Sequence, residues 1–323
     1  MRNEKKQSFN VGVDMGGTKV AIGLVTPEGE ILKKKKYATE AYKGHERIIK
    51  KLIREIKSLI VDSSIDFDDI YSIGIGVPGT VDLDTGEIIL APNIHWRHIP
   101  LGKELRFAFP NIVCFIDQDT NASALGEFWA CKDPSINNLF FITISTGIGS
   151  GVIINRQLYR GQGNTAGEIG HMIMERNGIK CTCGNRGCLQ AYAKGPAIIK
   201  EVESRIRNGE NSLLKETLNK GNLTVTQIAR VALEGDKLAC SVILKAAEYV
   251  GIALANIIDL ISPDLIVIGG GVARCGSIFV DRIINIAKSN CYPPARGKVK
   301  IKITNLFEDA GIIGASMIHT TME

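Results

Sequence analysis

The stretch FNVGVDMGGTKVAIGLV, residues 9–25, is the part of the sequence that most constrains the fold. Residues 9–13 form a short β-type run, and residues 20–25 resume it after the segment Asp14-Met15-Gly16-Gly17-Thr18-Lys19. Strand, glycine turn and strand predict a hairpin whose tip brings backbone N–H groups close together. Such a tip could bind phosphate, because glycines let an anion approach the main chain. The alternative is a tight hairpin in which the glycines only satisfy positive φ.

A second segment repeats this pattern. Residues 140–145 are apolar and β-rich, residues 146–151 (TGIGSG) interrupt them, and residues 152–154 resume the strand. Two such hairpins, about one domain length apart, suggest an internal duplication, although they share little literal sequence. Two facing glycine loops could hold one nucleotide. Neither loop has a Walker A sequence or opens a helix, so the P-loop and Rossmann interpretations are disfavoured.

The remaining pattern predicts an α/β protein, because strands and helices are mixed along the chain. A third strand starts at Ile31, and an amphipathic helix follows with one apolar face. Its apolar positions are Ile48, Ile49, Leu52, Ile53, Ile56, Leu59 and Ile60. Further strands are expected at residues 70–77, 112–116, 265–268 and 299–304, with a long helix at residues 237–261 and a short helix at the C-terminus.

The composition is that of an ordinary soluble protein. The chain has 323 residues, enough for two domains or one large one, with 45% hydrophobic and 23% charged residues. A net charge of +5 is too small and too dispersed to indicate nucleic acid, and the run Lys33 to Lys36 is interpreted as a solvated strand end. No leader segment is evident, and polar residues interrupt the long helix, so neither export nor a membrane span is expected.

Eight cysteines without an export signal point to a reducing, cytoplasmic compartment. Five are scattered singly and are interpreted as buried hydrophobic residues: Cys114, Cys131, Cys240, Cys275 and Cys291. The others form the motif Cys181-x-Cys183 and Cys188, with His171 ten residues upstream. Three thiolates and one imidazole are a ligand set for tetrahedral Zn²⁺. The alternative is a disulfide plus a spare thiol. A closed shell of four protein ligands leaves no position for water, so the zinc would be structural.

Four motifs together resemble the ROK family, which comprises bacterial-type glucokinases, fructokinases, N-acetylmannosamine kinases and related sugar-binding repressors. The motifs are residues 14–19 (DMGGTK), 118–121 (QDTN), 167–171 (GEIGH) and 181–188 (CTCGNRGC). The resemblance covers essentially the whole chain, including residues 269–271 (GGG) and 309–315 (DAGIIGA). The cysteine motif with its upstream Glu-x-Gly-His is highly specific, and the glycine loops are much less so.

The resemblance implies an actin/hexokinase-type fold, with two ribonuclease-H-like domains flanking an interdomain cleft where ATP and sugar meet. A small domain would comprise residues 8–118 plus 306–323, and a large domain residues 119–305. Two glycine loops would hold the phosphates of Mg·ATP, with Gly269, Gly270 and Gly271 near the adenosine. Their expected phosphate-side residues are Asp14, Gly16, Gly17, Thr18, Lys19, Thr146, Gly147, Gly149 and Gly151.

Asp119 follows a predicted buried strand and precedes a helix expected to begin near Asn121. A carboxylate there could accept the proton of a sugar hydroxyl as it attacks the γ-phosphate. The alternative is a helix N-cap, but the resemblance favours the catalytic base. The resemblance also implies that Trp96 forms part of the wall of the sugar pocket. The residues that it places on the sugar side are Gly79, Thr80, Asn93, Gln118, Asn121, Glu168, His171 and Gln190. Glu168 taken alone could equally be a surface charge.

Two positions depart from the family pattern. Many members have Asn where this chain has Gln118, and the kinases usually have Glu where it has Gln190. An amide can donate as well as accept, whereas a carboxylate only accepts. Gln190 could therefore pair with a ring oxygen, a carbonyl or an N-acetyl group near the anomeric end of the sugar. Alternatively, it is a tolerated near-isostere, and Glu168 recognises the sugar alone.

The sequence thus predicts a cytoplasmic ATP-dependent hexose kinase, acting on the 6-hydroxyl, with structural zinc. From the resemblance we expect a homodimer or larger homo-oligomer with no nucleic-acid or membrane partner. The main alternative is a non-catalytic sugar sensor like the family's repressors. A first strand near residue 9 would leave no room for their DNA-binding domain. A phosphatase or acyl-phosphate enzyme of the same superfold is disfavoured by the zinc motif.

Overall fold

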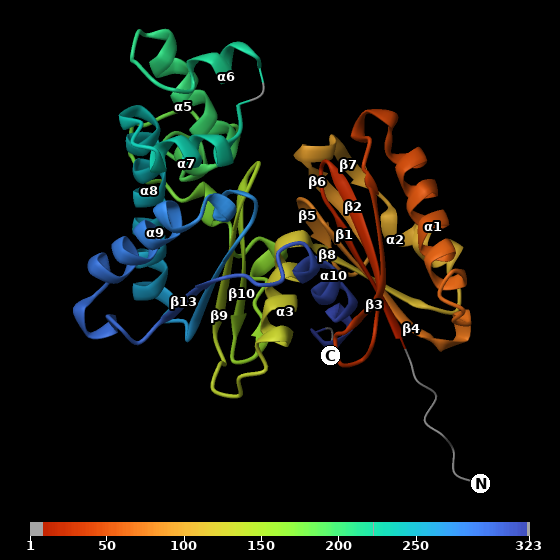
Figure 1. Cartoon of the computed structure of the whole chain (residues 1–323). Coiled ribbons are helices and arrows are strands. Elements are labelled where there is room, and N and C mark those ends of the chain that lie inside the picture. The colour runs from red at the N-terminus through yellow and green to blue at the C-terminus, as the bar shows by residue number, and fades with distance from the viewer. Residues whose placement is uncertain (1–8, 222, 322–323) are drawn as a thin grey trace. The chain divides into compact units, whose positions relative to one another are not determined.

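The computed structural model describes residues 9–221 and 223–321. Within these residues there are two five-stranded sheets (Figure 1). When the strands of each sheet are numbered in the order of the chain, both sheets have the strand order third, second, first, fourth, fifth. The first consists of β3 (Ile31–Ala38), β2 (Lys19–Val25), β1 (Phe9–Met15), β4 (Ile70–Val77) and β8 (Val113–Gln118). The second consists of β11 (Gln157–Leu158), β10 (Ile148–Ile154), β9 (Leu139–Ile144), β12 (Leu265–Gly269) and β13 (Lys300–Ile303). This shared order supports the predicted duplication.

The chain divides into two compact units. The first comprises the described parts of Met1–Ser135, Gly151–Ala166 and Leu306–Glu323, and the second comprises Ile136–Ser150 and Gly167–Asn305. The C-terminal segment therefore returns to the first unit, as in the expected small domain. Residues 119–135 and 151–166 also cluster there, whereas the expected boundary assigned them to the large domain. The domain boundary itself stays a prediction.

In the first unit, β1 separates two different layers. Its odd-numbered side chains Val11, Val13 and Met15 are fully buried in a large hydrophobic core. That core includes one face of α1 (His45–Val61), the amphipathic helix that the sequence predicted, and part of α2 (Leu101–Ala108). The large apolar residues of the first hairpin thus lie on one face of the sheet.

The other face of the sheet is lined by glycine, so a helix lies directly on the strands (Figure 1). A Cβ at Gly12 would lie 1.9 Å from the carbonyl oxygen of Ile312, and one at Gly74 would lie 1.8 Å from that of Ala315. Both carbonyls belong to α10 (Asp309–Ser316). Real Cβ contacts are never this short, so these positions admit only glycine.

A similar contact joins α10 to α3 (Asp119–Cys131), which begins two residues earlier than expected. A Cβ at Gly314 would lie 1.6 Å from the carbonyl oxygen of Ala122, and one at Gly126 would lie 2.1 Å from that of Ala310. Two helices that cross at glycines can bring their backbones together. The position of α3, which carries Asp119, therefore depends on this crossing.

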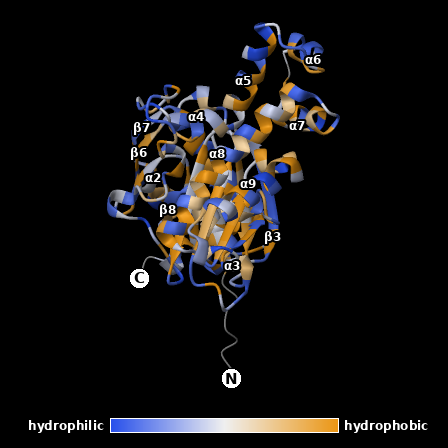
Figure 2. Ribbon diagram, turned by 90° about the vertical axis from the view of Figure 1, so that its left-hand side faces the viewer, coloured by the Kyte–Doolittle hydropathy of each residue, from blue (hydrophilic) through white to orange (hydrophobic). Residues whose placement is uncertain are grey.

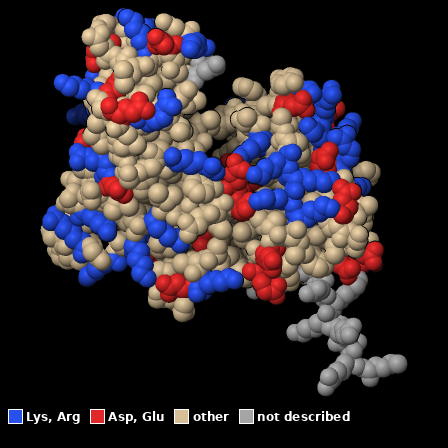
Figure 3. Space-filling model, viewed as in Figure 1, with Lys and Arg blue, Asp and Glu red and all other residues tan. Residues whose placement is uncertain are grey.

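The lysine run lies on β3, which is an edge strand of the first sheet. Lys33 and Lys35 bond to Asp62, at the end of α1, while Lys34 and Lys36 pair with Asp309 and Glu308 beside α10. Basic and acidic residues are accordingly interleaved on the face of this unit that carries β3 (Figure 3). The lysines are thus the central residues of β3 and not its end, so the interpretation as a strand end is wrong, although alternate lysines are exposed. Lysines on an edge strand also discourage pairing with a further strand.

A small antiparallel sheet completes the first unit. It is formed by β5 (Thr80–Asp82), β6 (Glu87–Ala91) and β7 (Trp96–Ile99). Gly79, at the start of this excursion, has φ of +96°, and a Cβ there would lie 2.0 Å from the carbonyl oxygen of Leu90. Trp96 is buried and meets the ring of His45 edge-on.

The second unit is built around α8 (Lys237–Ile261). By length and composition alone this helix could cross a membrane, but much of it is buried against its neighbours, as in a core helix. Hydrophobic residues are frequent along it (Figure 2). The helices around it are α4 (Gln190–Ala193), α5 (Gly195–Arg207), α7 (Val225–Leu233) and α9 (Ser277–Asn290), and α6 (Lys215–Asn219) lies between α5 and α7 in the chain.

Two local expectations differ from the structure. β10 already begins at Ile148, so Gly149 and Gly151 lie within the strand and not in the turn. A Cβ at Gly151 would lie 2.5 Å from the carbonyl oxygen of Thr120, which explains a glycine inside a strand. Of the scattered cysteines, Cys275 and Cys291 are buried, but Cys114, Cys131 and Cys240 are only half-buried.

The contact between α10 and α3 gives a test of the fold. We expect Gly314→Ala to lower the free energy of unfolding by about 2 kcal/mol or more, because the added methyl forces the two helices apart. Ala130→Ser, at an exposed position of α3, should change it by less than about 0.5 kcal/mol. Urea denaturation of both variants measures the difference. Equal stability of the two would mean that the helices can separate without cost.

Candidate functional site

The turn of the first hairpin consists of Gly16, Gly17 and Thr18, between β1 and β2. The Gly16 N–H donates to the carbonyl oxygen of Lys19 at 2.8 Å, and the Thr39 hydroxyl donates to the carbonyl oxygen of Gly16 at 2.7 Å. Neither turn glycine has a positive φ, so the alternative that they only satisfy positive φ is wrong. A Cβ at Gly17 would lie 3.2 Å from the Asn93 carbonyl oxygen, so the structure brings Asn93 beside this turn.

Asp14 lies on the glycine-lined face of β1, against the beginning of α10. A Cβ at Gly311 would lie 2.7 Å from its carboxyl carbon, so the DAG motif provides room for this side chain. Burial raises the pKa of Asp14 from its ordinary value of 3.8 to about 6, partly opposed by Lys19. The site thus holds a carboxyl group that does not ionise easily by itself. A cation beside it would favour its charged form.

Glu308 joins two lysines near Asp14. One of its oxygens pairs with Lys19, the last position of the DMGGTK motif, and the other pairs with Lys36. These two hydrogen bonds lower the pKa of Glu308 to about 2. Glu308 therefore holds the Lys19 ammonium group at the base of the hairpin. The sequence analysis did not identify this residue, because its partners are 272 and 289 positions away in the chain.

The QDTN segment lies at the end of β8 and contributes to a buried polar network around Asp117. The Asp117 carboxylate is fully buried; it accepts hydrogen bonds from Asn121 at 2.9 Å and Asn164 at 3.2 Å, and pairs with Arg160 at 2.7 Å. The Gln118 amide donates to the carbonyl oxygen of Asn164 at 2.6 Å. Gln118 and Asn121 are thus brought together and held rigidly. Sequence reasoning missed Asp117, Arg160 and Asn164.

Asp119 is the first residue of α3, and the N-cap is Gln118, which makes no side-chain cap. The alternative role of Asp119 as an N-cap is therefore not observed. Its side chain is partly exposed. Its Cα lies 3.2 Å from where a Cβ at Gly76 of β4 would be. The small residue on β4 thus lets the start of α3 lie directly against the sheet.

In the second unit, the structure brings the second hairpin and the GGG segment together. The hairpin turn is closed by the Ser145 N–H donating to the carbonyl oxygen of Gly147 at 2.8 Å. Gly270 follows β12 with φ of +88°, and a Cβ there would lie 2.3 Å from the carbonyl oxygen of Ile144. Gly271 would place a Cβ 3.8 Å from the Ser145 hydroxyl. Thr146 and Gly147 therefore lie in the turn whose base adjoins Gly269, Gly270 and Gly271.

The GEIGH motif packs onto β10 through its two glycines. A Cβ at Gly167 would lie 2.8 Å from the carbonyl oxygen of Ser150, and one at Gly170 would lie 2.1 Å from that of Ile148. A 3₁₀ turn, Ile169–His171, follows Glu168. The Glu168 carboxylate is half-exposed, and its Oε2 lies 4.0 Å from Nε2 of His171. Glu168 and His171 therefore lie on the same side of this turn.

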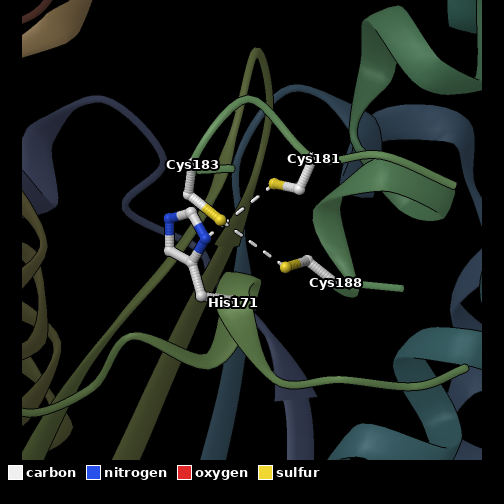
Figure 4. A group of neighbouring side chains, drawn as sticks. All are labelled: His171, Cys181, Cys183 and Cys188. Atoms are coloured by element: carbon white, nitrogen blue, oxygen red, sulfur yellow. Dashed lines mark hydrogen bonds between the residues drawn. The ribbon is translucent and has the colours of Figure 1, made fainter. Parts of the chain in front are cut away.

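His171 turns its other ring nitrogen to the cysteine motif (Figure 4). Its Nδ1 lies 3.9 Å from Sγ of Cys181, and the sulfurs of Cys183 and Cys188 lie 3.7 Å apart. All four candidate ligand atoms lie within 4.8 Å of one another. The two sulfurs at 3.7 Å are not bonded, so the disulfide alternative is not observed. The arrangement can hold one metal ion.

The three thiols of this cluster cannot all ionise easily unless a cation lies among them. Burial disfavours a Cys181 thiolate, but hydrogen bonds from the Cys183 N–H and from Gln190 outweigh it and lower its pKa to about 6. Burial and the neighbouring sulfurs raise the pKa of Cys188 to about 12. Three thiolates in one place repel one another, and a bound metal ion removes that cost.

A second anchor holds the loop of the cysteine motif, and sequence reasoning missed it. The Glu175 carboxylate accepts a hydrogen bond from the Tyr192 hydroxyl at 3.1 Å and another from the Tyr249 hydroxyl. The two tyrosine rings are stacked, with centroids 4.4 Å apart. The Tyr192 oxygen also accepts from the Ile179 N–H at 2.8 Å. The loop is thus fixed to α4 and α8 independently of a metal ion.

Gln190 is buried at the start of α4, beside the cysteine motif. Its Nε2 donates to Sγ of Cys181 at 3.3 Å. Its Oε1 lies 3.7 Å from where a Cβ at Gly147 would be. Gln190 therefore reaches from the metal-ligand cluster to the turn of the second hairpin.

Comparisons with known proteins agree with these features. A family model described as the ROK family matches residues 10–322. The glucokinase of Halalkalibacterium halodurans is 32% identical over 315 residues, which cover 97% of this chain and 95% of that enzyme. A putative xylose repressor of a Caldicellulosiruptor species is 30% identical over 314 residues, which cover 96% of this chain and 77% of the repressor.

A solved structure extends the comparison to the fold. The structure of a ROK family glucokinase from Streptomyces griseus, in complex with glucose and AMPPNP, matches with a TM-score of 0.81 at 30% identity. The match covers 96% of this chain and 99% of that one. The α/β fold is therefore of the actin/hexokinase type, with two ribonuclease-H-like sheets, as the sequence predicted. Since the family model and these relatives extend over nearly the whole sequence, the chain belongs to the ROK family.

Proposed function

We propose that the protein is a sugar kinase that transfers the γ-phosphoryl group of Mg·ATP to a hexose hydroxyl. The 6-hydroxyl is the proposed acceptor. The observation that best supports this is the position of Asp119: it begins α3 without serving as its N-cap, beside the bonded amides of Gln118 and Asn121. The similarity to glucokinases over the whole chain supports the same activity.

Asp119 would act as the general base. Its carboxylate would accept the proton of the sugar hydroxyl while the hydroxyl oxygen forms a bond to the γ-phosphorus and the bond from that phosphorus to the ADP oxygen breaks. Such a reaction depends mainly on positioning and charge stabilisation. The rigid network around Asp117 supplies the positioning on this side, because Asn121 and Gln118 cannot reorient without losing buried hydrogen bonds.

The sugar would be oriented by polar side chains. Glu168 offers a half-exposed carboxylate, and the Nε2 of His171 faces it. The further residues proposed on the sugar side are Gly79, Thr80, Asn93, Gln118, Asn121 and Gln190.

The nucleotide would be bound by the two glycine turns. The backbone of Gly16, Gly17 and Thr18, the ammonium group of Lys19 and the turn at Thr146 and Gly147 would face the phosphates, with the segment from Gly269 to Gly271 near the adenosine. When bound, Mg²⁺ neutralises phosphate charge. Asp14 fits a role beside it, because a carboxyl group with a raised pKa gains most from a neighbouring cation.

His171, Cys181, Cys183 and Cys188 would hold Zn²⁺. One imidazole nitrogen and three sulfurs are a usual ligand set for a structural zinc ion, and their closeness in this chain fits one ion. When bound, the ion would link the four side chains and so fix the loop that contains them. It would fix the ring of His171, whose Nε2 is then available to Glu168 or to a sugar hydroxyl.

The alternative is a sugar-binding protein without kinase activity. The similarity to a putative xylose repressor over 96% of the chain is the specific observation in its favour. The sugar side of the site would be the same in both cases, so only turnover separates them. The expected homodimer or larger assembly stays a prediction in either case.

The test is an ADP-release assay with Mg·ATP and a panel of glucose, mannose, fructose, N-acetylglucosamine and N-acetylmannosamine. We expect sugar-dependent ADP formation with at least one of them, and a phosphate ester on its 6-hydroxyl by NMR. Sugar binding by calorimetry without any ADP formation would instead support the sensor.

Asp119→Asn should keep sugar and nucleotide affinity but lower kcat by about 10²- to 10⁴-fold, because a nearly isosteric amide cannot accept the hydroxyl proton. The matched control is Asp84→Asn at an exposed position of the same unit, which should turn over normally. Steady-state kinetics and calorimetry give the two quantities. Near-normal turnover by Asp119→Asn would exclude it as the base.

Cys183→Ser should lose the metal ion and weaken sugar binding more than ATP binding, because the loop that includes His171 loses its centre. Cys240→Ser, outside the cluster in the same unit, should retain one zinc per chain. Elemental analysis after gel filtration and calorimetry with sugar and nucleotide measure both effects. Metal-free wild-type protein with full sugar affinity would contradict the proposed zinc site.

Asp14 should make stability depend on pH. Its folded pKa, about 6, lies above its unfolded value of 3.8, so the folded state retains the proton longer. The Asp14 contribution to the free energy of unfolding should therefore fall as pH rises from about 4 to about 6 and stay constant above that range. Urea denaturation of wild type and Asp14→Asn without nucleotide or Mg²⁺ measures it. A wild-type minus variant difference that does not change with pH contradicts the raised pKa.

A further inference from the structure

Arg160 connects two segments of the first unit that are far apart in the sequence. Its Nε donates to Oδ2 of Asp117, near the end of β8, at 2.7 Å. Its other two nitrogens donate to Thr321: Nη2 to the hydroxyl oxygen at 2.6 Å and Nη1 to the carbonyl oxygen at 3.3 Å. Thr321 ends a 3₁₀ turn, Ile318–Thr321. One guanidinium group therefore links this C-terminal turn to the residue that precedes the QDTN segment.

The two oxygens of the Asp117 carboxylate bind different groups. Oδ2 accepts from Arg160. Oδ1 accepts from the Gln118 N–H at 2.7 Å, the Asn121 amide at 2.9 Å and the Asn164 amide at 3.2 Å. Because a carboxylate is planar and rigid, the direction of one oxygen fixes the direction of the other. Arg160 thereby fixes the oxygen that holds the N-cap and the first turn of α3, where Asp119 lies.

Stability alone is a weak reason for such an ion pair. The Asp117 side chain is fully buried, and that of Arg160 is 13% exposed. Burial of two charges carries a desolvation cost that their attraction offsets only in part, so apolar replacements are often no less stable. An arginine, however, has a planar set of donors with fixed directions, and it can bind a carboxylate and two further oxygens at once. What this pair contributes is therefore orientation.

We propose that Arg160 is a positioning residue for phosphoryl transfer: it transmits the position of the C-terminal turn, through Asp117, to the first turn of α3 and so to Asp119. This rests on the proposed function of Asp119 as the general base. When the guanidinium group loses Thr321, the Asp117 carboxylate can rotate, and the hydrogen bonds to its Oδ1 weaken. The value of kcat should then fall more than substrate affinity, because reaction rates depend steeply on the alignment of the reacting groups.

Thr321→Val and Thr320→Val form a matched pair of variants. Each removes a hydroxyl that donates within the turn at 2.8 Å, to the carbonyl oxygen of Ile318 or of Met317. Only Thr321→Val also removes an acceptor of Arg160. The loss of a bond within the turn is common to both variants, so the difference between them reports the contact with the guanidinium group. A third variant, Arg160→Lys, retains the positive charge but not the planar set of donors.

The first measurement requires no activity. Hydrogen exchange is followed by NMR at the Gln118 N–H, which donates to Asp117. In Thr321→Val and Arg160→Lys this amide should exchange at least about threefold faster than in wild type, because the bond that protects it is weakened. In Thr320→Val it should exchange as in wild type. Equal exchange of this amide in Thr321→Val and Thr320→Val overturns the proposal.

The second measurement is of turnover and affinity, by steady-state kinetics and calorimetry with the sugar that wild type accepts. Arg160→Lys should lower kcat by about 10- to 100-fold, and Thr321→Val should lower it by a smaller factor. The affinities for sugar and ATP should change less than kcat, and Thr320→Val should turn over normally. A loss of sugar affinity as large as the loss of kcat contradicts a role in positioning, as does equal turnover by Thr321→Val and Thr320→Val.

The proposed function and the role of Arg160 fail in distinguishable ways. If wild type turns over no sugar, the proposed function fails, and exchange at Gln118 still decides whether Arg160 holds this segment. If wild type is active and exchange at Gln118 rises in the variants without any fall in kcat, the role in catalysis is excluded. All measurements are made below the melting temperature of each variant, so that the comparison is between folded proteins.

Discussion

The close approach of α10 and α3 to the glycine-lined face of the first sheet is the constraint on which the candidate site residues of the first unit depend. Gly12, Gly74, Gly126 and Gly314 admit backbone contacts that no other residue allows. Asp14 follows Gly12 on the same face, and Asp119 begins the helix that crosses α10 at its glycines. The backbone positions of two carboxyl groups 105 residues apart thus depend on glycines elsewhere in this unit.

In the second unit, glycines likewise let a polar motif lie directly against a strand. Gly167 and Gly170 let the GEIGH motif lie on β10, so that Glu168 and the 3₁₀ turn that contains His171 are held against a strand. The loop that follows is held at two places, by the Glu175–tyrosine contacts and by the cysteine cluster. A metal ion bound at the cluster would therefore act on a loop that the contacts of Glu175 already hold in place. Such an ion would orient the ring of His171.

Many elements of the fold and several candidate site residues could be predicted from the sequence. Most of the residues that were missed were missed for one reason. The hairpin at residues 9–25, α1, α8 and the cysteine cluster follow from short-range patterns, periodicity and ligand spacing. The GGG segment and the roles at Asp119 came from family resemblance. Asp117, Arg160, Asn164, Glu308 and Glu175 were missed because each acts through a partner far away in sequence. The start of β10 was misplaced because glycines usually end strands, whereas Gly151 is required there by a neighbouring backbone.

The four consecutive lysines of β3 have a consequence for strand register. Alternate members reach opposite faces of the sheet, one pair to Asp62 and the other to Glu308 and Asp309. If β3 were shifted by one residue, a lysine would still lie near each acidic group. The contacts of the lysines therefore do not determine the register of β3 against β2. Register must come from the residues at either end: the turn at Gly29, with φ of +87°, and Tyr37, which packs against the core. The four lysines thus connect α1 and α10 to the edge strand, but they do not set its register.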